Sequence, residues 1–230
     1  MTDRLTIAGL QRFLGVADDD VFGPRTMNAM FAKLSNKKAP ALTKADFMVA
    51  ATRLGVPVGH IRGVRKIEAP RGPYDDDGRP SILYERHKFR NNTVPKGRFN
   101  STHPALSGPP YGPGGYGAFG AQYGKLAAAC ALDPEAAFRA CSWGAFQVLG
   151  ENAVALGYAS AVDMALTLVT GEAAHLETFV RYVETNNLID KFRACRPNDA
   201  KSCQPFVAGY NGPGYKTFKY DTKLAAAIAG

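Results

Sequence analysis

Apolar residues recur along this chain mostly at helical intervals, and runs that alternate as in a strand are few. Near the start, Thr6 is placed to cap a first helix that Gly15 ends, and Gly23-Pro24 starts a second, because proline is favoured at the first helical position. The apolar stripe of this second helix comprises Met27, Met30, Phe31 and Leu34. Two helices bury little surface, so we expect residues 1–36 to form a small helical module that leans on the rest of the chain.

A larger unit, residues 42–230, follows a short linker. Thr43 with Asp46 resembles a capping box and opens a helix that ends at Gly55. Pro57 starts the next helix, which ends at Pro70. Residues 71–115 are rich in glycine, proline and charge and predict irregular structure, with a short strand near Ser81–Tyr84.

The rest of the chain is predicted to be helical at seven places. These are residues 117–131, 134–141, 145–156, 161–169, 172–186, 199–209 and 221–229. Strand signals are sparse, so we expect a mainly α fold with a minor, short β element.

Glu68 is the candidate with the sharpest chemistry. It follows Ile61 and Val64 at i, i+3 and i+7, which places its carboxyl on the apolar stripe of the helix, in the last turn, where the helix dipole disfavours negative charge. Burial and dipole both raise the pKa of an acid. A protonated carboxyl near neutral pH is the group that donates a proton in glycoside cleavage. The alternative is a buried glutamate neutralised by Arg65.

The net charge is +8, and the whole surplus lies in residues 1–100, with +6 in residues 42–100 around Glu68. Such a surplus indicates a polyanionic partner or serves solubility alone. Arg65 and Lys66 also introduce an opposing effect, because adjacent cations lower the pKa of an acid.

Four cysteines and four histidines show no spacing typical of a zinc site, and we expect no metal and no cofactor. Cys130 with Cys141, and Cys195 with Cys203, are near enough in sequence to pair in an oxidising compartment. The alternative is four reduced thiols, which the lack of an apolar signal segment after Met1 favours.

Four blocks resemble the N-acetylmuramidase family of phage endolysins, and they occur in family order. They are Val64–Ala69, Gly78–Phe89, Ser142-Trp143-Gly144-Ala145-Phe146-Gln147 and Tyr210-Asn211-Gly212-Pro213-Gly214-Tyr215. The family is similar in plan to goose-type lysozymes, which implies a lysozyme-like α+β fold. It also implies cleavage of the bond between N-acetylmuramic acid and N-acetylglucosamine in peptidoglycan.

The resemblance assigns roles to single residues. Glu68 matches the catalytic glutamate, Gln147 is implied as a sugar contact, and Tyr210 with Asn211 resembles a pair near the cleavage point, where the tyrosine steadies the acid or the distorted sugar. Trp143 is predicted either to present its ring to sugar or to anchor the core.

Tyrosines in Gly/Pro-rich loops are further candidates for sugar contact. They are Tyr111, Tyr116 and Tyr215.

The second catalytic carboxylate is less defined. Asp77, the last of three aspartates after Glu68, is one candidate, although aspartates before a glycine are ordinary turn residues. Glu85 or His87 as a water-activating base is another, and the alternative there is a local ion network with Arg86.

Residues 10–15 and 21–26 resemble a peptidoglycan-binding module. The family usually has Asp-Gly where this chain has Asp19-Asp20, and aspartate tolerates a left-handed turn less well than glycine. The module is also shorter than the usual form, so a reduced structural remnant is the alternative.

The resulting prediction is a monomeric peptidoglycan muramidase with Glu68 as general acid. The alternatives are a lytic transglycosylase on the same fold and a non-catalytic wall-binding phage protein. Nucleic-acid binding is not expected, because no such motif is present. The absence of a signal segment predicts accumulation in the host cytoplasm, and the family implies access to the wall after holin-type release. The charge further predicts contact with the anionic bacterial envelope.

Overall fold

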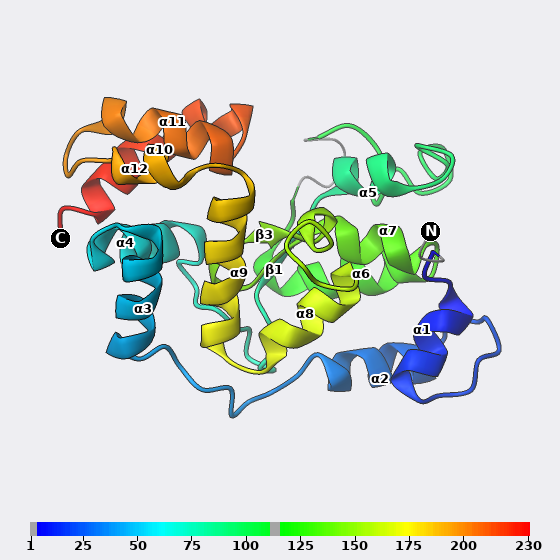
Figure 1. The fold of residues 1–230 in the computed structure, drawn as a ribbon. Coiled ribbons are helices and arrows are strands. Elements are labelled where there is room, and N and C mark those ends of the chain that lie inside the picture. Colours follow the sequence, from blue (N-terminus) through cyan, green and yellow to red (C-terminus); the bar gives the residue numbers. More distant parts are fainter. Residues whose placement is uncertain (1–3, 111–115) are drawn as a thin grey trace.

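The computed structural model describes residues 4–110 and 116–230, and it divides into two lobes (Figure 1). The helical lobe holds α3 (Lys44–Leu54), α4 (Val58–Glu68), α9 (Glu172–Thr185), α10 (Ile189–Arg193), α11 (Ala200–Tyr210) and α12 (Tyr220–Ala227). The sheet lobe holds three strands with α5 (Arg86–Asn92), α6 (Gln122–Cys130), α7 (Pro134–Arg139) and α8 (Ala161–Val169). The expected mainly α fold with a minor β element is confirmed.

The sheet is small and antiparallel, in the order β1 (Ile82–Tyr84), β2 (Cys141–Trp143), β3 (Val148–Leu149). The strand predicted near Ser81–Tyr84 is confirmed, but the helix predicted over residues 145–156 is wrong. The chain there forms short 3-10 turns, η2 (Gly144–Phe146) and η3 (Gly150–Asn152), on either side of β3.

Two backbone features explain why this segment is not a helix. Gly144 and Gln147 both have a left-handed φ, at 71° and 49°, which reverses the chain around η2. Gly150 lies so close to the preceding helix that a Cβ there would be 2.2 Å from the Phe138 carbonyl oxygen. Tertiary contacts thus override an apolar spacing that mimics a helix.

The other predicted helices are present, and their ends follow the expected chemistry. Thr43 and Asp46 form the reciprocal capping box of α3, and Gly55 ends that helix with a left-handed φ of 64°. The short helices α5 and α10 were not predicted. In α5 only Phe89 is a buried apolar residue, so no apolar stripe marks it in the sequence.

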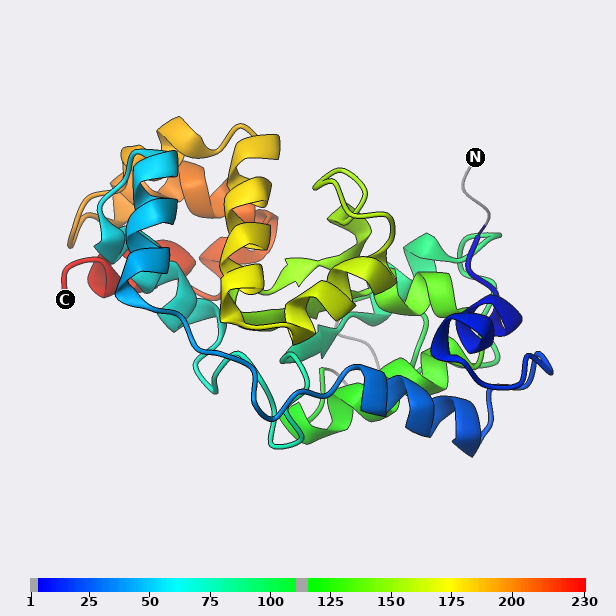
Figure 2. The same ribbon diagram turned by 60° about the horizontal axis from the view of Figure 1, so that its bottom comes forward.

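The N-terminal helices α1 (Ile7–Leu14) and α2 (Pro24–Lys33) lie against the sheet lobe (Figure 2). Arg4 pairs with Asp133 at 2.5 Å, and the ring of Phe31 meets that of Tyr123 edge-on at 5.8 Å. The expectation that this module leans on the main unit is confirmed. Asp20 has a φ of 59°, so an aspartate occupies the left-handed position where the resembled family usually has glycine.

Three chain segments cross between the lobes, and hydrogen bonds join them into a seam. We define the seam as residues 35–43, 69–81 and 168–172. Asn36 donates its backbone N–H to the Gly78 carbonyl at 2.9 Å and its side-chain amide to the Val169 carbonyl at 3.0 Å. The hydroxyl of Tyr74 donates to the Leu168 carbonyl at 2.9 Å. Each crossing is therefore bonded to the other two.

Among the described residues, helices are too short or too polar to cross a membrane. Within the same residues, side chains of His, Cys, Asp and Glu do not gather in groups of three that would hold a metal ion. All four cysteines are buried and unbridged, and Cys195 is in contact with Cys203.

Candidate active site

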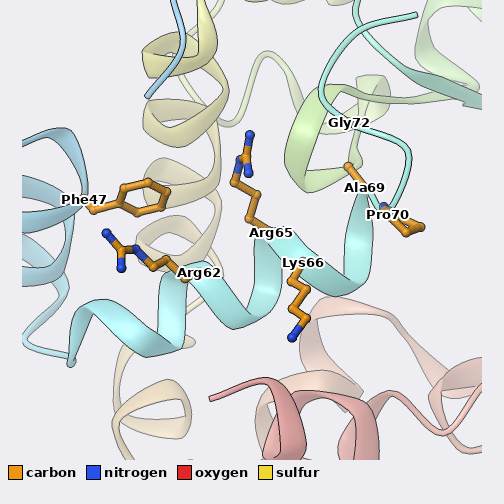
Figure 3. A pocket seen from close by; sticks show the side chains of 7 residues that line it. All are labelled: Phe47, Arg62, Arg65, Lys66, Ala69, Pro70 and Gly72. Carbon is orange, nitrogen blue, oxygen red and sulfur yellow. The ribbon is translucent and has the colours of Figure 1, made fainter. Parts of the chain in front are cut away.

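Helix α4 has a buried apolar face and an exposed basic face, and this pattern positions the candidate acid. Ile61 and Val64 are fully buried, whereas Arg62 and Lys66 project from the exposed side (Figure 3). Glu68 is the last helical residue, and Ala69, with a φ of −127°, takes the chain out of the helix. The carboxyl therefore lies at the boundary between the helix core face and the seam.

The carboxyl of Glu68 is half-buried and held by one side-chain hydrogen bond. Asn211, at the end of α11, donates its amide to Oε1 at 2.8 Å. Burial raises the pKa of Glu68 to about 7, although the Asn211 hydrogen bond and the charge of Lys223 act in the opposite direction. The predicted upward shift is confirmed, and the carboxyl retains a proton over much of the neutral range.

The cation that opposes this shift is not the one the sequence suggested. Arg65 donates to Glu172 at 2.6 Å and is engaged there, while Lys66 extends into solvent. Lys223 comes from α12, which packs along α4. The expectation that Arg65 and Lys66 would lower the pKa of Glu68 is wrong, because neither side chain is directed at the carboxyl. Nor does Arg65 neutralise Glu68.

Tyr210 ties α11 to the sheet lobe. Its hydroxyl donates to the carbonyl of Phe146 at 2.5 Å, and its ring stacks on Phe206. Burial and the nearby Glu68 raise the pKa of this tyrosine well above its usual value, so the hydroxyl stays protonated. Tyr210 and Asn211 thus lie beside Glu68, as the resemblance implied for this pair.

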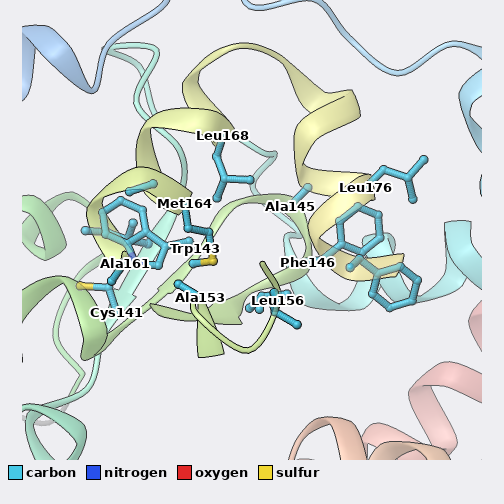
Figure 4. Packing of buried hydrophobic residues seen from close by; sticks show 14 of the residues in the cluster. Cys141, Trp143, Ala145, Phe146, Ala153, Leu156, Ala161, Met164, Leu168 and Leu176 are labelled. Atoms are coloured by element: carbon cyan, nitrogen blue, oxygen red, sulfur yellow. The ribbon is translucent and has the colours of Figure 1, made fainter. Parts of the chain in front are cut away.

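Trp143 is a core residue, which contradicts its prediction as a sugar contact. The side chain is 1% exposed, its ring stacks on Phe138 with 9° between the planes, and its Nε1 donates to the Phe138 carbonyl. Figure 4 shows it on β2, beside Ala161 and Met164 of α8. Both faces of the indole are occupied, so no face is left for a sugar.

Gln147 is half-buried in the turn that follows η2. Its side-chain amide donates to the carbonyls of Gly144 at 2.9 Å and Ser81 at 3.2 Å. These bonds hold the side chain against β1, and its sugar contact remains a prediction.

A buried histidine supports the same turn and was missed in the sequence. Nδ1 of His175 accepts from the Ala145 N–H at 2.9 Å and Nε2 donates to the Leu168 carbonyl at 2.8 Å. Burial lowers the pKa of His175 to about 4, so the ring is neutral. The lone histidine in a helical pattern gave no sign of this role, because its partners lie in distant segments.

Glu85 and His87 form a separate polar group on the sheet lobe. Glu85 accepts from the Ser142 hydroxyl at 3.1 Å, and His87 Nε2 lies 3.6 Å from its carboxylate. Burial raises the pKa of Glu85 and lowers the pKa of His87. Arg86 reaches the Ser107 carbonyl at 3.4 Å, and among the described residues the ion pair within this group joins Glu85 to His87. A catalytic role for Glu85 or His87 remains a prediction.

Asp77 lies in a turn that faces the linker between the module and α3. Arg79 pairs with Asp75 at 2.8 Å and with Asp77 at 2.7 Å, and Gly78 takes the left-handed φ of 73°. The Asp77 side chain is 60% exposed and its carbonyl accepts from the Ser35 hydroxyl. Asp75 and Asp77 thus stabilise a turn, in agreement with the alternative that these aspartates are ordinary turn residues.

The loop tyrosines have different outcomes. Tyr215 is buried, so its prediction as an exposed sugar contact is wrong. The half-buried Tyr116 has a carbonyl that accepts from Gln122 and from Lys125, and its sugar contact remains a prediction. Tyr111 lies outside the described residues.

A half-buried acid whose pKa is raised by burial, held at a helix end in a mainly helical fold, matches what acid catalysis of glycoside cleavage requires. The model of the N-acetylmuramidase family matches residues 57–230. The crystal structure of the Burkholderia AP3 phage endolysin is similar, with 30% identity and a TM-score of 0.70, over 98% of this chain and 97% of that one. Curated proteins give no match. The chain belongs to the N-acetylmuramidase family and is a peptidoglycan hydrolase.

Proposed function

We propose that Glu68 is the general acid that cleaves the bond between N-acetylmuramic acid and N-acetylglucosamine. The observation that carries the proposal is the half-buried carboxyl whose pKa is raised to about 7. In the protonated form it donates its proton to the glycosidic oxygen as the bond breaks and an oxocarbenium-like state develops. Water then completes the hydrolysis.

Asn211 and Lys223 act after proton transfer. The amide of Asn211 donates to Oε1, and Lys223 contributes positive charge, so both favour the carboxylate that remains when the proton has left. Burial therefore keeps the carboxyl protonated before the reaction, and Asn211 and Lys223 stabilise the carboxylate that forms when the proton leaves. This balance is what efficient acid catalysis near neutral pH needs.

The groups that shift the pKa of Glu68 include no second carboxylate of the described residues. This supports a mechanism with one dominant acid, and it leaves the lytic transglycosylase alternative, in which the 6-hydroxyl of the sugar attacks. Mass spectrometry of digested peptidoglycan separates the two. Reducing ends are expected, and a 1,6-anhydro product would contradict hydrolysis.

Replacing Asn211 by alanine is expected to raise the pKa of Glu68 further, because the hydrogen bond that favours the ionised acid is lost. The alkaline limb of kcat/KM should move up by about one pH unit. The measurement is a pH profile of peptidoglycan solubilisation. Asn186→Ala is the matched control, since this exposed side-chain amide donates to the Tyr182 carbonyl, one turn before it, and is far in sequence from the acid. An unmoved limb in the Asn211 variant would exclude Glu68 as the titrating group.

We also propose a lytic role in which the protein accumulates, as a monomer, in the host cytoplasm and reaches the wall through a lesion in the membrane. The similarity to a phage endolysin supports this role. Expression in a Gram-negative host should leave culture turbidity unchanged until chloroform permeabilises the inner membrane, after which turbidity should fall within minutes. Lysis without permeabilisation would contradict the proposal.

The surplus of +6 in residues 42–100 supports contact with the anionic envelope during that step. We propose that residues 1–36 form a peptidoglycan-binding-like module, because Asp20 adopts the left-handed conformation that the turn of such a module requires. We propose residues 42–230 as the catalytic domain. The family match begins within that domain, at Pro57.

A further inference from the structure

A basic pocket lies beside the candidate acid, on the neighbouring face of the same helix. Its volume is about 450 Å³, and its walls are formed by Phe47, Arg62, Arg65, Lys66, Ala69, Pro70 and Gly72. Three of these residues are cations and none is an acid (Figure 3). We call this the α4 pocket.

The cations of the α4 pocket keep binding capacity. Arg62 lies over the ring of Phe47 at 5.0 Å, and this cation–π contact restrains its guanidinium. Neither Arg62 nor Lys66 forms an ion pair with a carboxylate of the described residues. Arg65 uses Nη2 to bind Glu172, while its Nε is buried without a hydrogen-bond partner.

The α4 pocket lies close to Glu68 because both belong to the C-terminal part of helix α4. At about 100° per residue, Arg65 is about 60° around the helix from Glu68, and Ala69 and Pro70 of the pocket wall directly follow the acid. Glu68 does not line the pocket itself. A group bound in the pocket would therefore belong to a substituent of the sugar at the acid, outside the glycosidic bond.

The substrate carries such a substituent. Each N-acetylmuramic acid bears a lactyl group that is extended by a short peptide with several free carboxylates, and this sugar is one of the two joined by the cleaved bond. Arginine and lysine side chains bind carboxylates by charge-assisted hydrogen bonds. We propose that the α4 pocket binds the carboxylates of this stem peptide, so that the protein prefers glycan that still carries its peptides. The proposal rests on the proposed function of Glu68.

The test compares two substrates with the full-length protein. One is intact peptidoglycan, and the other is the same glycan after an amidase has removed the stem peptides. In the Arg62→Ala/Lys66→Ala variant, the ratio of kcat/KM on intact polymer to kcat/KM on stem-free glycan should fall about tenfold, because the amidase removes the peptide carboxylates and leaves only the lactyl carboxylate that it frees. An equal loss on both substrates, or no loss, would overturn the proposal.

The matched control removes the same charge and the same type of contact elsewhere. Arg98 lies over the ring of Phe99 at 5.2 Å, and Lys96 is exposed near it, so Lys96→Ala/Arg98→Ala should leave the substrate ratio unchanged. A fall in the control ratio would mean that net charge, not the pocket, selects the substrate. Thermal unfolding checks each variant, and Lys66→Ala alone, at an exposed position, serves if the double variant does not fold.

Two further outcomes separate this proposal from others. If the Arg62→Ala/Lys66→Ala variant loses binding to lipopolysaccharide vesicles while its substrate ratio is unchanged, the pocket serves the envelope surface and the stem-peptide proposal is wrong. If the native protein cleaves neither substrate, or cleaves both with Glu68 replaced, the proposed function itself has failed. If only the pocket proposal fails, the native protein still cleaves stem-free glycan, and this cleavage still depends on Glu68.

Discussion

Replacing Glu68 by glutamine is expected to lower peptidoglycan hydrolysis about a hundredfold to ten-thousandfold, because the amide cannot donate the proton that the leaving oxygen needs. In the native protein, kcat/KM should fall as the pH rises through about 7, where the carboxyl loses that proton. The measurements are the release of reducing ends and the pH profile. Full activity in Glu68→Gln would refute the assignment.

The same variant has a thermodynamic signature that distinguishes a lost proton donor from a damaged fold. The pKa of Glu68 is raised from 4.5 to about 7 on folding, so native stability is lost as the pH rises through this window. Glu68→Gln removes that loss and should be more stable than the native protein at pH 8, by up to about 3 kcal/mol. A less stable variant would mean that the glutamate is structural.

His175 acts in the opposite direction. Its pKa falls from 6.5 to about 4 on folding, so its contribution to stability is lost as the pH falls below 6.5. In the native protein the two slopes oppose each other between pH 4.5 and 6.5. In Glu68→Gln the opposing slope of Glu68 is absent, so the free energy of unfolding should increase with pH more steeply, or decrease less, than in the native protein across this range.

Replacing Trp143 by alanine is expected to reduce the free energy of unfolding by about 3–5 kcal/mol. The indole is 1% exposed, stacks on Phe138 and satisfies the Phe138 carbonyl, so the variant loses both packing and a buried hydrogen bond. Urea unfolding at fixed pH measures the loss.

Phe218→Ala provides the control, because this aromatic ring is 43% exposed and its removal should change stability by less than about 1 kcal/mol. If Trp143→Ala left stability intact and weakened substrate binding, the sugar-contact role would be restored. Activity per folded molecule should otherwise be close to native at temperatures below the unfolding transition.

Most helices could be predicted from the sequence, because helix caps and apolar stripes depend on residues that are neighbours along the chain. The capping box at Thr43 and Asp46 and the left-handed Gly55 follow from residue types within a few positions. The same logic found Glu68, whose place on an apolar stripe requires only the two preceding turns. It failed at Gly150, where a distant backbone sets the conformation.

The residues that surround Glu68 could not be predicted from local patterns, because they come from distant segments of the chain. Lys223 acts on Glu68 from the last helix, and nothing in its own neighbourhood indicates that helix's partner. Asn211 was reached only through the resemblance of its block. For Trp143 the sequence left two roles open, a sugar contact or a core anchor, and only its contacts in the fold decide for the core.

The seam also determines how the two lobes are able to move. Three independent crossings would let the lobes twist and slide as well as open, but Asn36 and Tyr74 bond each crossing to the other two. We therefore expect one dominant motion, a jaw-like rotation about the seam. Glu68 sits at the end of the helix that enters one of these crossings, close to the axis, where rotation moves atoms least. The acid thus stays in place while the jaws take up and release the polymer.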